Sequence, residues 1–148
     1  MELLSQLWVV GGTIGLEREL KNRPAGFRTH MLVAGASSLL VGVGQLAIMD
    51  PRFRIPFLVN IDPLRLVEAV VAGVSFIGAG TIFAQRGGQA VSGVTTAASL
   101  LMVAVIGAST GLRYHLLAFA ATVLTLLVLF LLNFAERKAG TKPPDEST

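Results

Sequence analysis

Five ionisable side chains cluster where the first apolar run of this chain ends, and they are placed for binding or proton chemistry. The run covers residues 3–16, and the group that follows it comprises Glu17, Arg18, Glu19, Arg28 and His30. Ionisable groups near a bilayer are costly, so they usually face a bundle interior or a water-filled cavity. This position predicts a functional cluster, although a lone histidine there is more often an interfacial side chain than a ligand.

A second group of ionisable residues begins the third apolar run. Asp62-Pro63 is a strong helix-start pair, because Asp accepts free backbone N–H groups and Pro fits the first helical position. Arg65 and Glu68 follow at spacings of three, which places them on one helix face with Asp62. Glu68 is expected about 9 Å along the helix from its start. Three interpretations of Glu68 stay open: a cation or proton site, a polar latch between subunits, or a local pair with Arg65 at the membrane surface.

The glycine-rich end of the same run offers a third kind of site. Gly78 and Gly80 precede a short connection, after which Thr95 and Thr96 open the next apolar run. Glycines can interrupt a helix and expose its carbonyl groups, and transporters build ion sites from such broken helix ends. The sequence therefore favours either an ion site at a break in the third helix or tight glycine packing without a site.

The residue types give little support to enzymatic chemistry. The chain has no cysteine, which excludes a disulfide framework, a thiolate metal site and a cysteine nucleophile. Its sequence also contains no Ser/His/Asp set, phosphate-binding loop or His-x-x-x-His pair. We predict a non-enzymatic protein without a resident cofactor. The scattered carboxylates suit a hard cation such as Mg²⁺, which prefers oxygen ligands, but they single out no metal ligand.

Composition assigns the elements that carry these residues to a membrane. Of 148 residues, 53% are hydrophobic and 14% are charged, whereas soluble domains average about 25% charged residues. The charges are clumped between long uncharged runs, which is typical of an integral membrane protein. The basic residues flank apolar runs and form no stripe on a polar surface, which excludes nucleic-acid binding. The N-terminus has no basic region or cleavage site, so we expect the first run to be retained as an anchor.

The apolar runs predict an all-α bundle of five transmembrane helices over residues 1–134 and a polar, disordered tail over residues 135–148. The predicted spans are residues 3–20, 29–49, 63–83, 93–108 and 116–134. Thr29 is the expected N-cap of the second span, and residues 50–61 are expected to lie in the membrane interface. Lys and Arg number eight on the side of the first loop and the tail and four on the other side. The positive-inside rule then places the C-terminus in the cytoplasm and the N-terminus outside.

Small residues predict where the helices meet. Gly11 and Gly15 form one G-x-x-x-G pair, Gly107 and Gly111 form another, and Gly73 lies in the third span. Such glycines let helix backbones approach closely. We predict helix packing at these positions and a small homo-oligomer, most simply a homodimer, that is assembled through glycine-rich faces.

Five motifs, taken in order, resemble the MgtC/SapB family of bacterial inner-membrane proteins. They are IGLEREL (14–20), PAGFRTHMLVAGA (24–36), DPLRL (62–66), VVAGVSFIGAGTI (70–82) and GVTTAASL (93–100). The resemblance implies a multi-pass protein of the bacterial inner membrane with five spans and a cytoplasmic C-terminus. The functional residues that it implies are Glu17, Arg18, Glu19, Gly26, Arg28, Thr29, His30, Asp62, Arg65, Gly78, Gly80, Thr95 and Thr96.

This chain departs from the family pattern in a few places. The family commonly has Gln where this chain has Glu68, and Gly, a basic residue and Trp where it has Ser75, Ser92 and Leu101. Some members of the family carry a soluble ACT-like domain after the membrane part. We expect this chain to resemble the short, membrane-only members.

The resemblance also implies a function. The family is associated with magnesium homeostasis and, in pathogens, with survival inside host cells, and it is linked to restraint of the F-type ATP synthase through membrane contacts. Our first hypothesis is therefore a non-enzymatic regulator that contacts a larger membrane complex such as the ATP synthase. The alternative is a small transporter or channel for Mg²⁺ or another cation that uses Glu68 and a glycine-rich break in the third helix.

Overall fold

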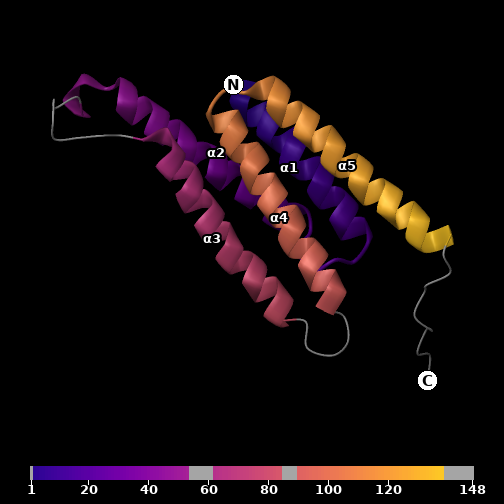
Figure 1. The fold of residues 1–148 in the computed structure, drawn as a ribbon. Helices are drawn as coiled ribbons and strands as arrows, with labels where there is room; N and C mark the ends of the chain where they lie inside the picture. Colours follow the sequence, from indigo (N-terminus) through magenta and orange to yellow (C-terminus); the bar gives the residue numbers. More distant parts are fainter. Residues whose placement is uncertain (1, 54–61, 85–89, 139–148) are drawn as a thin grey trace.

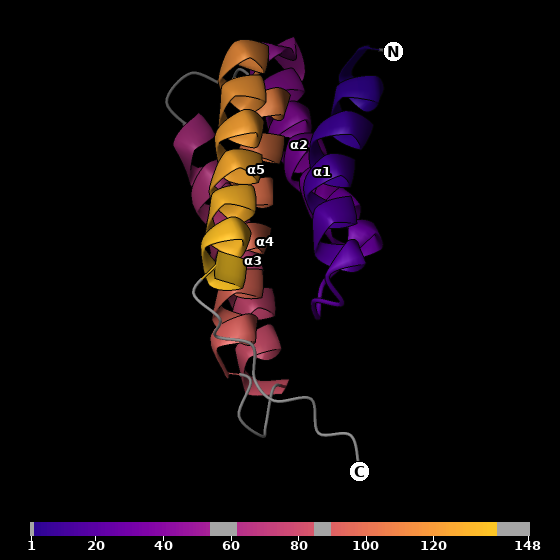
Figure 2. The ribbon, with the colours of Figure 1, turned by 90° about the vertical axis from the view of Figure 1, so that its right-hand side faces the viewer.

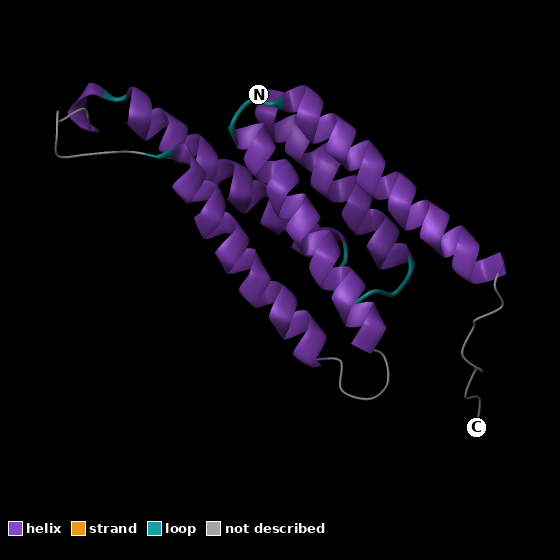
Figure 3. Ribbon diagram, in the orientation of Figure 1, coloured by secondary structure: helices purple, strands orange, loops and turns teal. Residues whose placement is uncertain are grey.

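Five α-helices form the chain in the computed structural model, which describes residues 2–53, 62–84 and 90–138. They are α1 (Glu2–Leu20), α2 (Phe27–Met49), α3 (Pro63–Ala84), α4 (Ala90–Gly111) and α5 (His115–Lys138), with a short 3-10 helix, η1 (Pro51–Phe53), after α2. Helices are the only regular elements in these described ranges (Figure 3). The all-α prediction is confirmed.

The helix α4 is the centre of the bundle. It packs against each of the other four helices, whereas α3 packs only against α2 and α4 among the described helices. In the α4 span 56% of the residues are buried, compared with 17% in the α3 span. Figure 1 shows α3 and α5 on opposite sides of α4. The view in Figure 2 shows α1 and α2 along one side of the other three helices.

Among the described residues, three helices are long and apolar enough to cross a bilayer. Their spans are Phe27–Met49, Leu64–Ala84 and Gly93–Gly111, and α5 contributes the shorter apolar segment His115–Leu131. Spans of 19 to 23 residues correspond to about 29–35 Å, which matches a hydrocarbon thickness of about 30 Å. The five-span topology and the sides on which the termini lie stay predictions.

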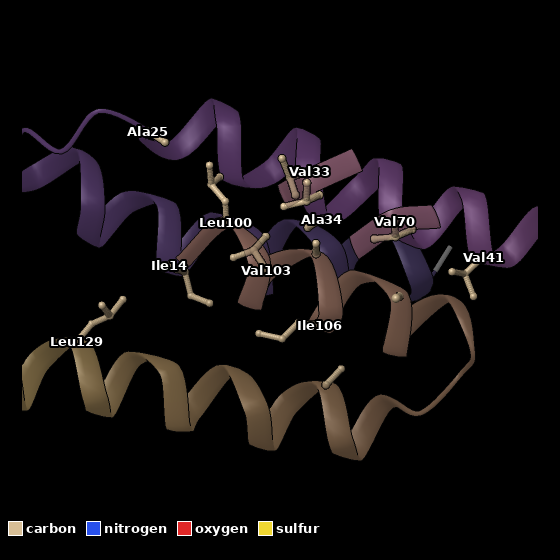
Figure 4. Packing of buried hydrophobic residues seen from close by; sticks show 14 residues of the cluster. Ile14, Ala25, Val33, Ala34, Val41, Val70, Leu100, Val103, Ile106 and Leu129 are labelled. Atoms are coloured by element: carbon tan, nitrogen blue, oxygen red, sulfur yellow. The ribbon is translucent and has the colours of Figure 1, made fainter. Parts of the chain in front are cut away.

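The buried core is built mainly from small and branched apolar side chains. Leu100, Val103 and Ile106 of α4 and Ile14 of α1 are fully buried. Figure 4 shows the three α4 side chains between α2 and α5, with Ile14 beside them. Lipid is as apolar as these side chains, so close van der Waals contact rather than removal of water must hold such helices together.

Glycines of α4 occupy its closest approach to α2. A Cβ atom at Gly107 would clash with the backbone carbonyl of Ala34, and one at Gly111 would lie 2.6 Å from the carbonyl oxygen of Ser38. No side chain fits between the two backbones at either position. The Gly107–Gly111 pair therefore packs inside one chain, along the seam between α2 and α4.

The helix α1 meets α2 in the same way. A Cβ atom at Gly15 would lie 2.7 Å from the Cα of Phe27, and one at Gly11 would lie 3.0 Å from the Cβ of Ala34. Gly73 of α3 differs, because a Cβ atom there meets no heavy atom within 4 Å. Of the glycines predicted to pack helices, only Gly73 thus remains on an open surface.

Several predicted helix ends differ from the structure. The helix α2 begins at Phe27 with Gly26 as its N-cap, so the prediction of Thr29 as N-cap is wrong. The reason is a carboxylate from the preceding helix that satisfies the Phe27 N–H group, as described below. In addition, α4 covers Ala90–Gly111 rather than residues 93–108, and α5 continues past residue 134 to Lys138.

Of the two interpretations of the glycine-rich end of the third helix, the structure excludes the break, because α3 is a continuous α-helix through Gly78 and Gly80. Gly78 instead permits close packing, since a Cβ atom there would lie 3.2 Å from the Cβ of Ala97 on α4. The Thr81 hydroxyl donates to the Gly78 carbonyl at 2.8 Å. This local hydrogen bond occupies the carbonyl that a broken helix would expose.

The segment after α2 is described only to residue 53. Asp50 caps the C-terminal end of α2, and its carboxylate pairs with the Arg52 guanidinium at 2.7 Å. That hydrogen bond, with a second from the Arg52 backbone N–H, holds the pKa of Asp50 below its usual value. Residues 54–61, which complete the predicted interfacial segment, and residues 139–148 of the predicted tail lie outside the described residues.

We expect Gly107→Ala to destabilise the bundle by about 1–3 kcal/mol, because the added methyl group must push α4 away from the Ala34 carbonyl. The free energy of unfolding in mixed micelles measures the effect. Gly42→Ala is the matched control, since a Cβ atom there meets nothing within 4 Å. Gly42→Ala removes a glycine from the interior of a helix, so it should leave the stability of the bundle unchanged or raise it by up to about 1 kcal/mol. Equal effects of the two substitutions would contradict the α2–α4 seam.

Candidate functional site

The residues of the first predicted group lie at the junction of α1 and α2, against the N-terminal half of α4. We define the α1–α2 polar cluster as Glu17, Arg18, Glu19, His30 and Ser99. Its first three members end α1, His30 lies in the first turn of α2, and Ser99 comes from α4. The cluster therefore joins three helices that are separated in the sequence.

Glu19 holds the start of α2. Its carboxylate oxygen Oε2 accepts the backbone N–H of Phe27 at 2.8 Å, and the first N–H groups of a helix have no partner within the helix itself. Gly26 makes this possible, because a Cβ atom there would lie only 2.9 Å from that carboxylate oxygen. Asn22, with φ of 50°, supports the tight turn between the two helices.

His30 is fully buried, so the expectation of an interfacial side chain is wrong. Its Nδ1 lies 2.9 Å from the Gly26 carbonyl oxygen, and its Nε2 lies 3.1 Å from the Ser99 hydroxyl. A carbonyl only accepts hydrogen bonds, so Nδ1 carries the proton in the neutral ring and Nε2 accepts from Ser99. The same hydroxyl lies 2.8 Å from the Thr96 carbonyl oxygen, so one proton serves two acceptors.

Arg18 is the largest side chain that is buried, with 1% of its surface exposed. Its Nη1 lies 3.9 Å from the Glu17 carboxylate, which also pairs with Lys21 one helical turn later. Removing one partner of a buried charge is strongly destabilising. The Glu17 carboxylate therefore lies between the buried Arg18 and the Lys21 ammonium at the end of α1.

An open cleft of about 480 Å³ lies beside this junction. Its lining residues are polar or small and carry charges of both signs: Glu19, Asn22, Arg23, Gly26, Arg28 and Thr29. Arg28 and Thr29 thus face the cleft rather than His30. The carboxylate of Glu19 is turned to the N-terminus of α2, and the arginines give the remaining lining a positive character.

The second predicted group does not form one site. Asp62 acts as the N-cap of α3, since its Oδ1 accepts the Leu64 N–H at 2.9 Å. Arg65 and Glu68 are exposed and form no ion pair with each other. They lie near the start of α3, at the opposite end of the bundle from the end of α1 (Figure 1). The structure therefore separates this group from the α1–α2 polar cluster.

The residues of the third predicted group have different surroundings and do not converge on one site. Gly78 packs on α4, Gly80 faces open space, and Thr96 is fully buried with its carbonyl oxygen beside the Ser99 hydroxyl. Thr81 bridges α3 and α4, because its hydroxyl also lies 3.5 Å from the Gly93 carbonyl oxygen.

Sequence reasoning missed two residues of these contacts, Ser99 and Thr81. The available signal was a small hydroxyl side chain inside an apolar run, which is common in helices of every kind. In the described part of the chain, His, Asp and Glu side chains do not gather in threes. The described residues therefore offer no cluster of such ligands for the Mg²⁺ ion that was considered from the sequence.

An all-helical membrane protein, whose polar residues join helices at one end of an apolar bundle, is the class that these features define. The MgtC family model matches residues 5–138, and the chain belongs to this family. The match covers all five described helices almost completely.

Several curated relatives resemble the chain over most of its length. SapB of Bacillus subtilis (strain 168) is 37% identical over 133 residues, covering 89% of this chain and 56% of SapB. YhiD of Escherichia coli (strain K12) is 39% identical over 118 residues, covering 80% of this chain and 53% of YhiD. MgtC of Salmonella typhimurium (strain 14028s) is 33% identical over 135 residues, covering 91% of this chain and 53% of MgtC. The chain spans about half the length of these relatives, and no solved structure matches it.

A double-mutant cycle tests the bond between α2 and α4. We expect His30→Ala and Ser99→Ala to be coupled by about 1 kcal/mol, the usual worth of a buried hydrogen bond. Unfolding in mixed micelles provides the three free energies that the cycle needs. Ser109→Ala is the matched control, because its hydroxyl donates to Val105 within α4 and its coupling to His30→Ala should be zero. A coupling energy of zero between His30→Ala and Ser99→Ala would contradict this contact.

Proposed function

We propose that this chain is a non-enzymatic regulatory protein of the bacterial inner membrane that acts in magnesium homeostasis and, in a pathogen, in intracellular survival. It works as a small homo-oligomer that contacts a larger membrane complex, such as the ATP synthase, through lateral helix–helix packing. The family match over residues 5–138 carries the proposal. One relative, YhiD of Escherichia coli (strain K12), bears a name that describes a proposed magnesium transporter, which supports the connection with magnesium.

The use of the polar residues supports a packing role. Glu19 caps α2, His30 and Ser99 bond α2 to α4, and Arg18 is buried at the junction. The side chains of Glu19, His30 and Ser99 therefore hold helices together. Large apolar side chains meanwhile remain exposed on α2, α3 and α5, and they supply the surface that lateral contacts in a membrane require.

The transporter alternative draws support from the same relative's name. In that alternative, the ion path passes through a break in the third helix, whereas α3 is continuous. Glu68 lies on an exposed face of that helix rather than among the buried polar residues. The geometry therefore favours the regulator.

Production of the chain in a Salmonella strain that lacks its own MgtC tests the proposal. We expect it to restore growth in medium with limiting Mg²⁺ and to lower the cellular ATP concentration, because a restrained ATP synthase makes less ATP. Growth curves and ATP measurements report the two effects. Gly42→Ala, whose added methyl group meets open space, should act like the unchanged chain.

Purified protein in liposomes separates the two functions. The regulator predicts flux of Mg²⁺, H⁺ or K⁺ no greater than in protein-free vesicles. Flux that is present in the unchanged chain and lost in Glu68→Gln would establish the transporter instead. Normal membrane levels of the chain with no change in growth or ATP would refute the regulatory role.

A further inference from the structure

The outer surface of α3 is the least covered helix face among the candidate spans. Only 17% of the residues in its span are buried, compared with 28% for α2 and 56% for α4. Its contacts with other described helices are to α2 and α4 alone, which leaves it at one edge of the bundle (Figure 1). The buried side of α3 carries Val70, Val74 and Gly78, and the opposite side is exposed.

Small residues alternate on this exposed side with the exposed apolar side chains Leu64, Phe76, Ile77 and Phe83. Ala69, Ala72 and Gly80 lie at helical spacing on it, Phe76 projects from its middle with 83% of its surface exposed, and Gly73 flanks them. A Cβ atom at Gly73 or Gly80 meets nothing within 4 Å. The Phe76 ring forms a ridge on this face, and the small residues beside it leave a groove. Helices pack by fitting such ridges into the grooves of a neighbouring helix.

The outward faces of α2 and α5 have a different character. Large apolar side chains dominate them, among them Leu39, Leu46, Leu116, Leu124 and Phe130. Such residues suit contact with flexible lipid chains, whereas small residues bring helix backbones together. The contrast marks the α3 face as the one built for another helix.

Two uncovered charges of opposite sign lie on the same face. Arg65 and Glu68 are both exposed, and neither forms an ion pair among the described residues. The span Leu64–Ala84 has 21 residues, or about 31 Å. Arg65 and Glu68 are its second and fifth residues, so both lie within its first two turns. Glu68 is the only acidic residue in the sequences of the three candidate spans. An ionised side chain at such a place normally meets a partner or water rather than lipid.

We propose that this face, defined as Arg65, Glu68, Ala69, Ala72, Gly73, Phe76 and Gly80, packs against the same face of a second copy. Copies inserted with the same orientation present parallel α3 helices, related by a two-fold axis normal to the membrane. Glu68 lies three residues, or about 4.5 Å, below Arg65 along the helix. The Arg65 side chain of each copy then reaches the Glu68 carboxylate of the other. Two equivalent ion pairs result, and each charge that lacked a partner gains one.

The two predicted G-x-x-x-G pairs are already used in packing within the chain. Gly11 and Gly15 are occupied by α2, and Gly107 and Gly111 pack on α2 from α4. Charge complementarity also selects a second copy over an unrelated helix, because one face supplies both members of each pair. The inference rests on the homo-oligomer in the proposed function and identifies the surface that forms it.

Cysteine crosslinking in native membranes tests the contact directly, because the full chain contains no cysteine of its own. Ala69→Cys, Ala72→Cys and Phe76→Cys each place one thiol on the face, and oxidation should give a product of twice the mass of the chain. Leu124→Cys is the matched control on the exposed surface of α5, where 59% of the side chain is accessible, and it should give only background. A product of another mass at Ala72→Cys, or equal dimer from both surfaces, would overturn the proposal.

Charge exchange between copies tests the ion pairs. In the Ala72→Cys background, Arg65→Glu or Glu68→Arg alone places like charges together and should lower the dimer yield by about tenfold or more. Co-production of the two variants with different tags should restore a mixed dimer, because one copy is then wholly negative and the other wholly positive on this face. No pairing within one chain can produce that rescue. Loss of dimer without rescue, or no loss in either single variant, would overturn the ion pairs.

The proposed function and the proposed dimer surface can be refuted independently. Growth and ATP effects that persist when dimer formation is abolished would retain the regulatory function and reject the dimer as its active form. A dimer that forms as described in a chain without effect on growth or ATP would retain the surface and reject the regulator.

Discussion

Close approach of two helix backbones is the constraint on which this structure depends. The helices α2 and α4 meet where Gly107 and Gly111 lie against the carbonyl groups of Ala34 and Ser38. In a bilayer, burial of apolar side chains gives little advantage over contact with lipid, so helices are held by dense packing and hydrogen bonds. This contact makes α4 the central element, and the other helices are arranged around it.

The same closeness explains why polar side chains can be buried at one end of the bundle. With α2 and α4 in contact, His30 reaches Ser99 across the seam. Glu19 reaches the start of α2 because glycine occupies position 26. His30 and Glu19 thus find partners on neighbouring helices, and a hydrogen bond offsets the cost of removing each of these groups from water. The charged motif at the end of α1 consequently determines how α1, α2 and α4 are joined.

The outward surfaces differ in side-chain size. Bulky apolar residues cover α2 and α5, whereas α3 combines small residues and two charges with the exposed side chains Leu64, Phe76, Ile77 and Phe83. In the function that we propose, these outward surfaces make the contacts with other molecules.

Much of this protein was determined by the sequence alone. Clumped charges between apolar runs predicted an all-helical membrane protein, Asp62-Pro63 located the start of α3, and the ordered motifs indicated the family. These features are local, because hydropathy and capping depend on residues close together in the chain. Sequence reasoning also found the residues around Glu17 and His30, but it misjudged His30 as interfacial.

Only the tertiary structure decided how those residues are used. Whether a glycine breaks a helix, packs inside a chain or faces outward depends on what lies opposite. Gly78 and Gly107 therefore pack against neighbouring helices, whereas Gly73 faces outward. The start of α2 likewise depends on Glu19 from the preceding helix, and the burial of His30 depends on Ser99 from α4. Local patterns report what a residue can do, whereas its neighbours across the bundle determine what it does.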